Sequence, residues 1–246
     1  MRRYSISAVF PCYNDEGTIA TMIFEAKAVL EKLTSDFEII VVDDGSADGS
    51  RELLRYLTGQ VSELNVVFHD KNEGYGTAIR DGFKAAKKDL IFYTDGDAQY
   101  DVKELPLLYE KLTDDVDIVN GYKIKRSDPL HRIIVGNIYQ YVMRFMFWLP
   151  IRDPDCDFRI IRRRVLENIT LLSTTGTFTI EFVKKSDQAG FRFAEVGVHH
   201  YFRIYGKSQF FNFKRVLKTL WRLIFLWTEL MVWSGGTGKK DVEKNH

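Results

Sequence analysis

Cysteine is scarce in this chain of 246 residues, which has only Cys12 and Cys156. Two cysteines cannot form the disulfide framework of a small secreted domain, and these two lack the spacing of a metal-binding pair. Such cysteine usage is typical of a reducing compartment. Neither sign of charge is in excess, since 35 lysines and arginines face 34 aspartates and glutamates. A general nucleic-acid-binding protein carries a strong basic excess, so the composition argues against that class.

Long uninterrupted apolar runs are also missing. The most apolar stretch, residues 216–233, contains Lys218, Arg222 and Glu229, which is not the pattern of a membrane-spanning helix. The apolar residues before Pro11 are too few for a secretory signal peptide. We therefore expect neither a spanning helix nor secretion, whereas contact with a membrane surface is compatible with the sequence.

What the chain does contain is the composition of a folded protein, with 45% hydrophobic and 28% charged residues. Its first half alternates short β-branched or aromatic runs with stretches of helical spacing. The strand-like runs are residues 5–10, 37–42, 65–69, 89–94 and 116–120, and the helical runs are 18–33, 50–57, 77–86 and 102–112. This alternation predicts a mostly parallel, Rossmann-like α/β sheet flanked by helices, in which ligands bind beyond the carboxyl ends of the strands.

The second half of the chain is less regular. It holds a long aromatic and aliphatic segment (132–149), a charged connector (152–164), a helix start (177–185), a strand-like run (196–209) and an apolar helix (214–233). We expect one domain over residues 1–209, an amphipathic helix over 210–233 and a polar, disordered tail over 234–246.

The strongest chemical signal is Asp95-Gly96-Asp97, with Gln99 close behind, directly after a strand-like run. In an extended backbone alternate side chains share a side, so Asp95, Asp97 and Gln99 would point the same way. Two carboxylates and a neutral oxygen suit a hard cation such as Mg²⁺ or Mn²⁺, which keeps positions open for substrate phosphates. The alternative is a strand that ends in an Asp-Gly turn with solvated acids.

Three other loops follow strand-like runs. Tyr13 in the first offers an aromatic ring for base stacking, although this loop also reads as an ordinary strand-to-helix connection. In the second, Asp43 is placed to accept hydrogen bonds from a ribose or base, while Asp44 is expected to serve the structure of the loop, with Asp44 or Ser46 as a cap of the next helix. In the third, residues 71–76, the glycines let a helix N-terminus approach a phosphate. No Walker-type loop occurs, which disfavours a P-loop ATPase.

In this order and spacing, the four loops resemble those of the family 2 glycosyltransferases, which have a GT-A fold. The resemblance runs from about Ser5 to Gln209. Within that family the chain is most similar to the dolichyl- and polyprenyl-phosphate sugar (mannosyl or glucosyl) transferases, on residues 153–159, 176–181 and 196–208. The resemblance implies an inverting enzyme that moves a hexose from a UDP- or GDP-sugar to a polyprenyl phosphate with the help of a divalent metal.

The resemblance assigns the donor nucleotide to the first two loops and to the start of the metal loop. The matching positions are Pro11, Tyr13, Asn14, Glu16, Val41, Asp43, Asp95 and Gly96. Asp95, Asp97 and Gln99 match the ligands of Mg²⁺ or Mn²⁺ and of the diphosphate, and Asp97 is implied to be catalytic. The metal would neutralise the leaving diphosphate while the acceptor attacks the anomeric carbon from the opposite face.

The implied acceptor, a polyprenyl phosphate, is already an anion near pH 7 and needs positioning by Arg or Lys rather than a general base. Arg203 matches a phosphate-binding arginine of the family, and Lys207 and Ser208 complete that segment. Lys123 is expected to be catalytic but stands where the family usually has arginine, so a bidentate contact is lost there. Gln209 stands where the family often has lysine, a loss for which Lys207 would compensate.

A sugar hydroxyl in polysaccharide or glycolipid synthesis is the alternative acceptor, and it would need a general base because it must lose its proton. Asp155, Asp157 and Glu181 are the candidate bases. Each also has a structural reading, in which Asp157 pairs with Arg159 and Glu181 anchors a helix. A third hypothesis is a non-catalytic, membrane-associated subunit that binds a nucleotide sugar.

Two segments read as apolar helices with a narrow polar stripe. The stripe residues are Asn137, Gln140 and Arg144 in the first segment and Arg215, Lys218, Arg222 and Glu229 in the second. Their wide apolar surfaces predict contact with a bilayer interface, and burial against the sheet or in a dimer is the alternative. We therefore expect a cytoplasmic protein, peripheral on the inner face of a membrane, with a homo-oligomer or a membrane-protein partner as further options.

Overall fold

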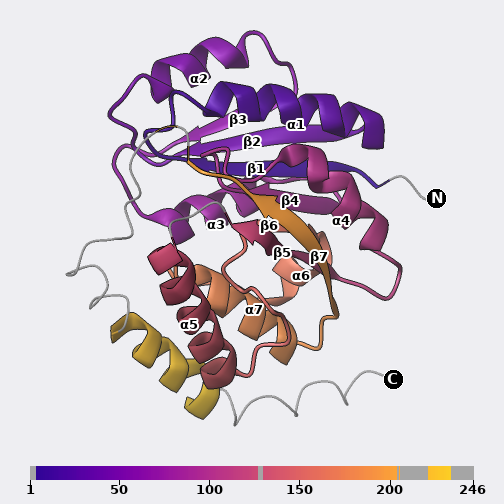
Figure 1. Cartoon of the computed structure of the whole chain (residues 1–246). Helices are drawn as coiled ribbons and strands as arrows, with labels where there is room; N and C mark the ends of the chain where they lie inside the picture. Colours follow the sequence, from indigo (N-terminus) through magenta and orange to yellow (C-terminus); the bar gives the residue numbers. More distant parts are fainter. Residues whose placement is uncertain (1–3, 127–129, 204, 206–220, 234–246) are drawn as a thin grey trace.

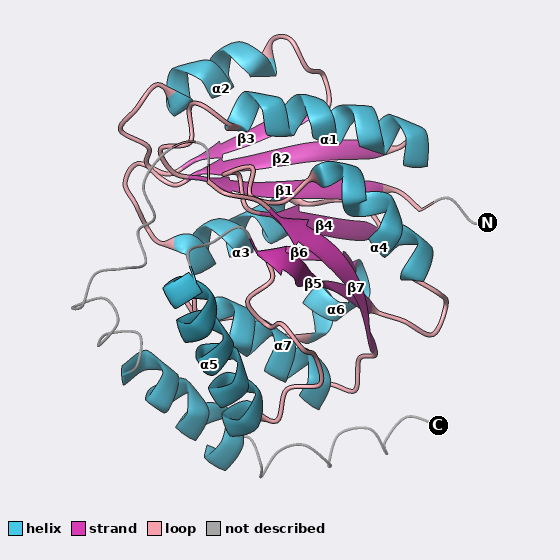
Figure 2. Cartoon of the chain, viewed as in Figure 1, coloured by secondary structure: helices cyan, strands magenta, loops and turns pink. Residues whose placement is uncertain are grey.

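The computed structural model describes residues 4–126, 130–203, 205 and 221–233. Its seven strands are β1 (Ile6–Cys12), β2 (Phe37–Asp43), β3 (Leu64–Phe68), β4 (Leu90–Thr94), β5 (Ile118–Arg126), β6 (Phe158–Arg162) and β7 (Phe193–His200). They form one sheet in the order β3-β2-β1-β4-β6-β5-β7, with helices on both faces (Figures 1 and 2).

The helices bury apolar residues against the two faces of this sheet. They are α1 (Ile19–Leu33), α2 (Ser50–Thr58), α3 (Tyr75–Ala85), η1 (Val102–Glu104), α4 (Leu105–Lys111), α5 (Leu130–Phe147), α6 (Arg163–Asn168), α7 (Phe178–Gln188) and η2 (Thr228–Trp233). Residues 221–227 are helical and lead into η2. One core lies under α1, α2 and α4, and a second core joins α3, α5, α6, α7 and η2 on the opposite face (Figure 1).

The predicted α/β sheet, mostly parallel, is confirmed, with one exception. Strand β6 lies between β4 and β5 and runs antiparallel to both. The expectation of a mere charged connector over residues 152–164 is therefore wrong. The charges of the segment hid the strand, because Phe158 and Ile160 are core residues and even Arg159 is fully buried between them.

The strand order places a ligand site at one point of the sheet. From β1 the chain proceeds outward through β2 to β3, and it then returns to β4 on the other side of β1. In open α/β sheets, ligands bind at such a reversal, beyond the carboxyl ends of the strands. The loops after β1 and β4 meet there, since the Thr18 hydroxyl donates to the Gly96 carbonyl at 2.9 Å. A Cβ atom on Gly96 would lie 2.6 Å from the Pro11 carbonyl oxygen, so this close approach requires glycine.

The C-terminal part of the chain is described in part. Residues 206–220 and the tail 234–246 lie outside the described residues, and so the expected boundaries at 209 and 233 stay predictions. Among the helices that the structure does describe, none has the length and apolar character needed to span a bilayer.

Candidate active site

Four carboxylates gather at the point where the strand order reverses. Asp95 and Asp97 follow β4, Asp15 follows β1, and Asp157 directly precedes β6. Burial raises the pKa of Asp95 well above its usual range, and the nearby charges of Asp157 and Asp97 raise it further. Burial also raises the pKa of Asp15 to about 6, with Asp97 contributing in the same direction. Carboxylates that raise one another's pKa in this way attract a cation.

Two tyrosines hold the carboxylates in place. The Tyr75 hydroxyl donates to Asp95 Oδ1 at 2.9 Å, and the Tyr93 hydroxyl lies 3.3 Å from Asp157 Oδ1, to which it donates. The buried Arg159 guanidinium donates from Nη1 to the Tyr93 hydroxyl oxygen at 2.6 Å. Arg159 is thus connected to Asp157 through Tyr93. Burial raises the pKa of Asp157, although the positive charge of Arg159 acts against this shift.

The structure brings together Asp97 and Arg203, which the sequence assigned to different substrates. Arg203 Nη2 and Nε donate to Asp97 Oδ2 at 2.5 and 3.2 Å. The other oxygen, Oδ1, accepts the backbone N–H of Gln99 at 3.1 Å. Asp97 is nearly fully buried, at 5% exposure, so this ion pair lies in a partly dehydrated environment in which it is stronger than at the surface. One ion pair therefore joins the predicted binding region of the acceptor phosphate to that of the sugar donor.

Gln99 is placed differently from what the sequence argument assumed. Strand β4 ends at Thr94 and Ala98 has φ of +58°, so residues 95–99 form a turn and the premise of an extended backbone is wrong. The Gln99 side-chain amide donates to the Tyr201 carbonyl at 3.0 Å. Gln99 therefore ties the metal loop to the segment that leads to Arg203, and a role as metal ligand would use its remaining amide oxygen.

The carboxylate oxygens of Asp95 and Asp97 fit a hard divalent cation as its ligands. No group of three or more histidine, cysteine, aspartate or glutamate side chains within the described ranges is placed to share one ion. Mg²⁺ is commonly held by one or two carboxylates, with substrate phosphates and water completing its shell. The guanidinium of Arg203 at Asp97 shows that the position accepts positive charge. The arrangement therefore fits a cation bound together with a diphosphate.

The loops after β1 and β2 are joined by the residues expected to hold the nucleotide. Asn14 donates its backbone N–H to Ser46 Oγ at 3.0 Å, and its side-chain oxygen accepts the Ala47 N–H at 2.8 Å. Glu16 Oε2 accepts the Gly49 N–H at 3.1 Å. The fully buried Asp43 accepts the Ser46 N–H through Oδ1. These contacts give the predicted donor pocket a fixed backbone.

Within that pocket the aromatic and aliphatic residues differ in solvent exposure. The Tyr13 side chain is 37% exposed and is free to contact a base. Pro11 is buried, and its carbonyl faces Gly96. Val41 lies in the middle of β2, paired with Phe10 and Val66, and is completely buried. Val41 is therefore a core residue, and its place among the donor-site positions stays a prediction.

Asp44 has the expected role in loop structure. Its carboxylate accepts the backbone N–H groups of Glu73 at 2.7 Å and Gly74 at 2.9 Å, and it lies 2.8 Å from His69 Nδ1. It thus fixes the loop that enters α3 and does not cap the next helix, α2. This side chain is one of the contacts that hold the loop over residues 71–76 at the site.

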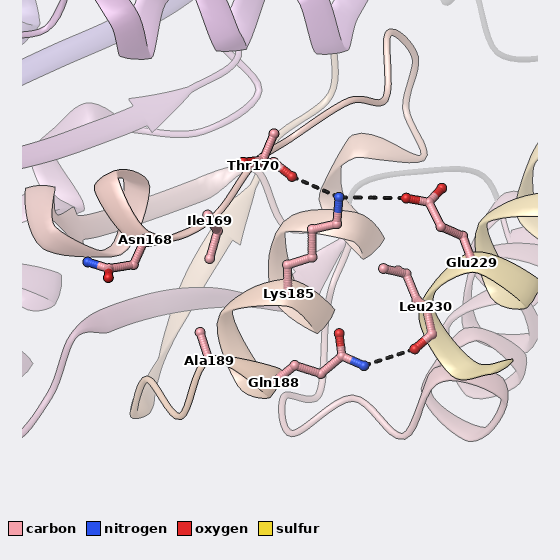
Figure 3. Close-up of a pocket in the computed structure, with 8 residues that line it drawn as sticks. All are labelled: Asn168, Ile169, Thr170, Lys185, Gln188, Ala189, Glu229 and Leu230. Carbon is pink, nitrogen blue, oxygen red and sulfur yellow. Dashed lines mark hydrogen bonds and ion pairs between the residues drawn. The ribbon is translucent and has the colours of Figure 1, made fainter. Parts of the chain in front are cut away.

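Glu181 is engaged in structural contacts that favour its reading as an anchor, and its role as a general base stays a prediction. Its buried carboxylate accepts the N–H groups of Leu172 at 2.9 Å and Ser173 at 2.7 Å, and it lies 2.6 Å from the ammonium group of Lys185. Figure 3 shows the same Lys185 at a cavity of about 290 Å³, where it also contacts the Thr170 carbonyl and Glu229. This cavity, between α6, α7 and η2, is lined by no predicted site residue.

Lys123 lies beside the segment that carries Asp155 and Asp157. Its ammonium group donates to the Asp155 carbonyl at 2.9 Å and lies 3.5 Å from Asp153 Oδ2. Burial raises the pKa of Asp155 to about 7, and the charge of Lys123 opposes this shift. The remaining predicted acceptor residues, Lys207 and Ser208, lie outside the described residues.

Sequence reasoning missed Asp15, Tyr75 and Tyr93. Asp15 stands between two residues that were assigned to the donor, and its position after β1 was the available signal. Tyr93 belongs to an apolar strand, in which a tyrosine is an ordinary core residue. Nothing in a single sequence indicates that the Tyr75 hydroxyl, at the start of a helix, reaches the carboxyl end of β4.

Comparison with known proteins agrees with this geometry. A family model described as glycosyl transferase family 2 matches residues 7–170. The undecaprenyl-phosphate 4-deoxy-4-formamido-L-arabinose transferase of Aeromonas hydrophila is 30% identical over 206 residues, which cover 83% of this chain and 62% of that protein. The protein of the same name from Yersinia pestis is 29% identical over 220 residues, covering 89% and 66%. The chain thus spans slightly less than two thirds of the length of these relatives.

Solved structures share the fold at lower sequence identity. The glucosyl-3-phosphoglycerate synthase of Mycobacterium tuberculosis, in complex with Mn²⁺, UDP and its product, has a TM-score of 0.69 at 18% identity, covering 92% of this chain and 79% of that one. A mannosyltransferase of Pyrobaculum calidifontis, with GDP-mannose and Mn²⁺, has a TM-score of 0.64 at 18% identity, covering 85% and 59%. Since the family model covers the sheet from β1 to β6 together with the carboxylates at its reversal point, the chain belongs to glycosyl transferase family 2 and has the GT-A fold.

Proposed function

We propose that this chain is an inverting glycosyltransferase that moves a hexose from a UDP- or GDP-sugar to a polyprenyl phosphate. The observation that carries the proposal is the contact of Arg203 with Asp97, which puts a guanidinium suited to an acceptor phosphate beside the carboxylates suited to the donor. Membership of family 2 supports sugar transfer. The names of the undecaprenyl-phosphate sugar transferases among its relatives support the acceptor class.

The donor binds across the loops after β1, β2 and β4. Tyr13 and Asp43 would bind the nucleoside, and Asp95 and Asp97 would hold Mg²⁺ or Mn²⁺ beside the diphosphate. The bound metal would supply positive charge that stabilises the leaving diphosphate. Arg203, which contacts Asp97, would bind the acceptor phosphate through its guanidinium. Asp15, at the same cluster, keeps the metal loop electronegative.

The transfer itself is a single displacement. An oxygen of the acceptor phosphate forms a bond to the anomeric carbon while the bond from that carbon to the diphosphate oxygen breaks, and the anomeric configuration inverts. The nucleoside diphosphate leaves with the electron pair. Because the attacking phosphate is already an anion near pH 7, no side chain has to remove a proton. Arg203 contributes by holding the attacking oxygen in line.

A hydroxyl acceptor is the second candidate, and Asp157 is the observation that favours it. Asp157 lies beside Asp95 with a raised pKa, as suits a general base. An Asp157→Asn variant separates the two readings. Turnover that is lost while the donor still binds supports a hydroxyl acceptor, whereas turnover that persists supports the lipid phosphate.

The test of the proposal is a release assay. Purified protein is incubated with Mg²⁺ or Mn²⁺, a panel of UDP- and GDP-sugars, and undecaprenyl or dolichyl phosphate in detergent. We expect release of nucleoside diphosphate only when the lipid phosphate is present, and its loss in Asp97→Asn. No release with any donor would favour a non-catalytic nucleotide-sugar-binding subunit, and full activity of Asp97→Asn would overturn the metal-dependent reaction.

We also propose that the chain works at the cytoplasmic surface of a membrane, through α5 and the helix over residues 221–233. The Trp227 indole N–H donates to the Met146 carbonyl at 2.8 Å, and the two helices lie side by side in Figure 1. Large apolar side chains are exposed on both helices and at the residue directly after α5. They are Ile138, Tyr141, Val142, Phe145, Trp148, Trp221, Ile224, Phe225 and Val232. We call these nine residues the apolar face. Exposed tryptophans beside aliphatic residues are typical of a membrane interface.

A further inference from the structure

The hydroxyl of Tyr75 is a buried polar group that the proposed reaction does not use. We propose that Tyr75 is a positioning residue, whose hydroxyl fixes the orientation of the Asp95 carboxylate and thereby sets the affinity of the site for its divalent metal. This inference rests on the proposed function, because it needs Asp95 to be a metal ligand.

The hydrogen bond between Tyr75 and Asp95 has a defined direction. Tyr75 is the first residue of α3, and its hydroxyl lies 2.9 Å from Asp95 Oδ1. A carboxylate is acceptor-only when ionised and a phenol has one proton to give, so Tyr75 donates and Oδ1 accepts. The terminal torsion of an aspartate is broad and two-fold, and this bond removes that freedom. Oδ2 is then the oxygen that Asp95 presents to a cation.

Asp157 is the neighbouring carboxylate that, after burial, most raises the pKa of Asp95. Its own Oδ1 accepts from the Tyr93 hydroxyl at 3.3 Å. Two ionised carboxylates repel each other at short range. The Tyr75 hydroxyl therefore holds Asp95 against a repulsion that would otherwise turn its carboxylate.

The backbone on both sides of Tyr75 is itself held by hydrogen bonds. On one side, the Asp44 carboxylate accepts the N–H of Gly74 at 2.9 Å. On the other side, Gly76 donates its N–H to the Thr174 carbonyl at 3.2 Å. A Cβ atom on Gly74 would lie 2.4 Å from that same carbonyl oxygen, so glycine is needed for the contact.

The segment that contains Thr174, which lies against these glycines, is itself held by a hydrogen bond. Ser173 precedes Thr174 and donates its N–H to the buried Glu181 carboxylate at 2.7 Å. Asp44, which follows β2, and Glu181, on α7, thus both support the segment that contains Tyr75. A side chain fixed this firmly can define the orientation of the group to which it donates. Loss of an outer-shell partner commonly weakens metal binding by about 10–100-fold.

The test measures Mn²⁺ binding to the full chain by electron paramagnetic resonance, with UDP or GDP present in separate titrations. We expect Tyr75→Phe to raise the Kd for Mn²⁺ by about ten-fold or more. The matched control is Tyr109→Phe, which removes a hydroxyl that accepts the Tyr4 N–H on the distant α4, and its Kd should equal that of the parent. In turnover assays, the KM for metal should rise in Tyr75→Phe while kcat at saturating metal stays close to that of the parent.

A second variant guards against a folding defect of the first. Asp44→Asn leaves Tyr75 and Asp95 unchanged but weakens the contact that holds Gly74, and it should also raise the Kd for Mn²⁺. Equal Mn²⁺ affinity in the parent, in Tyr75→Phe and in Asp44→Asn would overturn the positioning role while leaving the metal site intact. If the parent and Asp95→Asn bind Mn²⁺ equally weakly, the proposed metal site fails, and the positioning role fails with it.

Discussion

Arg203 donates from two of its nitrogens to one oxygen of Asp97, and this contact has a consequence for acceptor binding. In Arg203→Gln the charge-assisted bond to the acceptor phosphate is lost, which is worth about 1.5–3 kcal/mol. We expect kcat/KM for the lipid phosphate to fall by about 10–100-fold. Arg203→Lys should restore little, because an ammonium lacks the planar fork. Initial rates at varied lipid phosphate measure this.

The control for that series is Arg152→Gln. Arg152 is an exposed arginine that lies 3.5 Å from Glu195, so it carries the same charge on a surface pair away from the carboxylate cluster. Its removal should leave kcat/KM unchanged. Equal losses in the Gln variants of Arg152 and Arg203 would mean that net charge, and not the position of Arg203, governs acceptor binding.

The raised pKa of Asp155 predicts a pH dependence of stability. Its pKa is raised from 3.8 to about 7 by burial, so between about pH 4 and 7 the folded state holds a proton that the unfolded state has lost. The free energy of unfolding therefore falls as the pH rises through this window. Asp155→Asn removes the group, and its urea midpoint should fall less between pH 4.5 and 7.5 than that of the parent. Parallel pH profiles would contradict the assignment.

At the scale of elements, the sequence predicted the strands of the first half because each is a short β-branched run closed by turn residues. β2 was expected at residues 37–42 and is found at Phe37–Asp43. β6 was missed because Arg159 reads as a surface residue, although Asn120, Tyr93 and the Pro154 carbonyl satisfy its buried guanidinium. Such compensation depends on residues far apart in the chain, so no local pattern contains it.

The same dependence on non-local contacts limited what the sequence could predict about the site. Asp95 and Asp97 were found because a strand end followed by acids is a local pattern. The partners of Asp44 and Glu181 could not be named, because each carboxylate accepts backbone N–H groups of a loop outside its own element, Asp44 from Glu73 and Glu181 from Leu172. A local pattern can show that a carboxylate lies at a strand end, whereas its partners follow from how the loops are packed.

The loop before α3 gives a prediction about an element. Gly74 has φ of +101°, and a Cβ atom there would lie 2.4 Å from the Thr174 carbonyl oxygen, whereas Gly190 has φ of +82° and no atom within 4 Å of such a Cβ. Both glycines carry backbone strain on substitution, about 1–3 kcal/mol. Only Gly74→Ala must also displace the loop, so it should lower the unfolding free energy more than Gly190→Ala and weaken Mn²⁺ binding. Equal effects of the two substitutions in urea unfolding would contradict this.

At the scale of the whole molecule, the charged site and the apolar face lie on different parts of the fold. The carboxyl ends of β1 and β4 gather the charged groups. Helix α5 and the helix over residues 221–233 lie together on one side of the molecule (Figure 1). These two helices carry exposed aromatic side chains. Trp227 joins these two helices through the Met146 carbonyl, so they form one surface. The proposed water-soluble donor and lipid-linked acceptor would require such a division, because the acceptor phosphate must be reached while its chain stays in the bilayer.

The apolar face therefore predicts binding to lipid vesicles. Phe145 is 79% exposed and Phe225 is 66% exposed, so replacing either by Glu removes apolar area from a bilayer contact without opening the core. Burying a phenylalanine is worth about 1.5–3 kcal/mol, so each variant should bind phosphatidylglycerol-containing vesicles about ten-fold or more weakly in sedimentation assays. Tyr56→Glu, at 66% exposure on α2, is the matched control and should bind like the parent. A parent that stays in the supernatant would instead favour a protein partner for this face, since nine exposed apolar side chains on and directly after two joined helices require some cover.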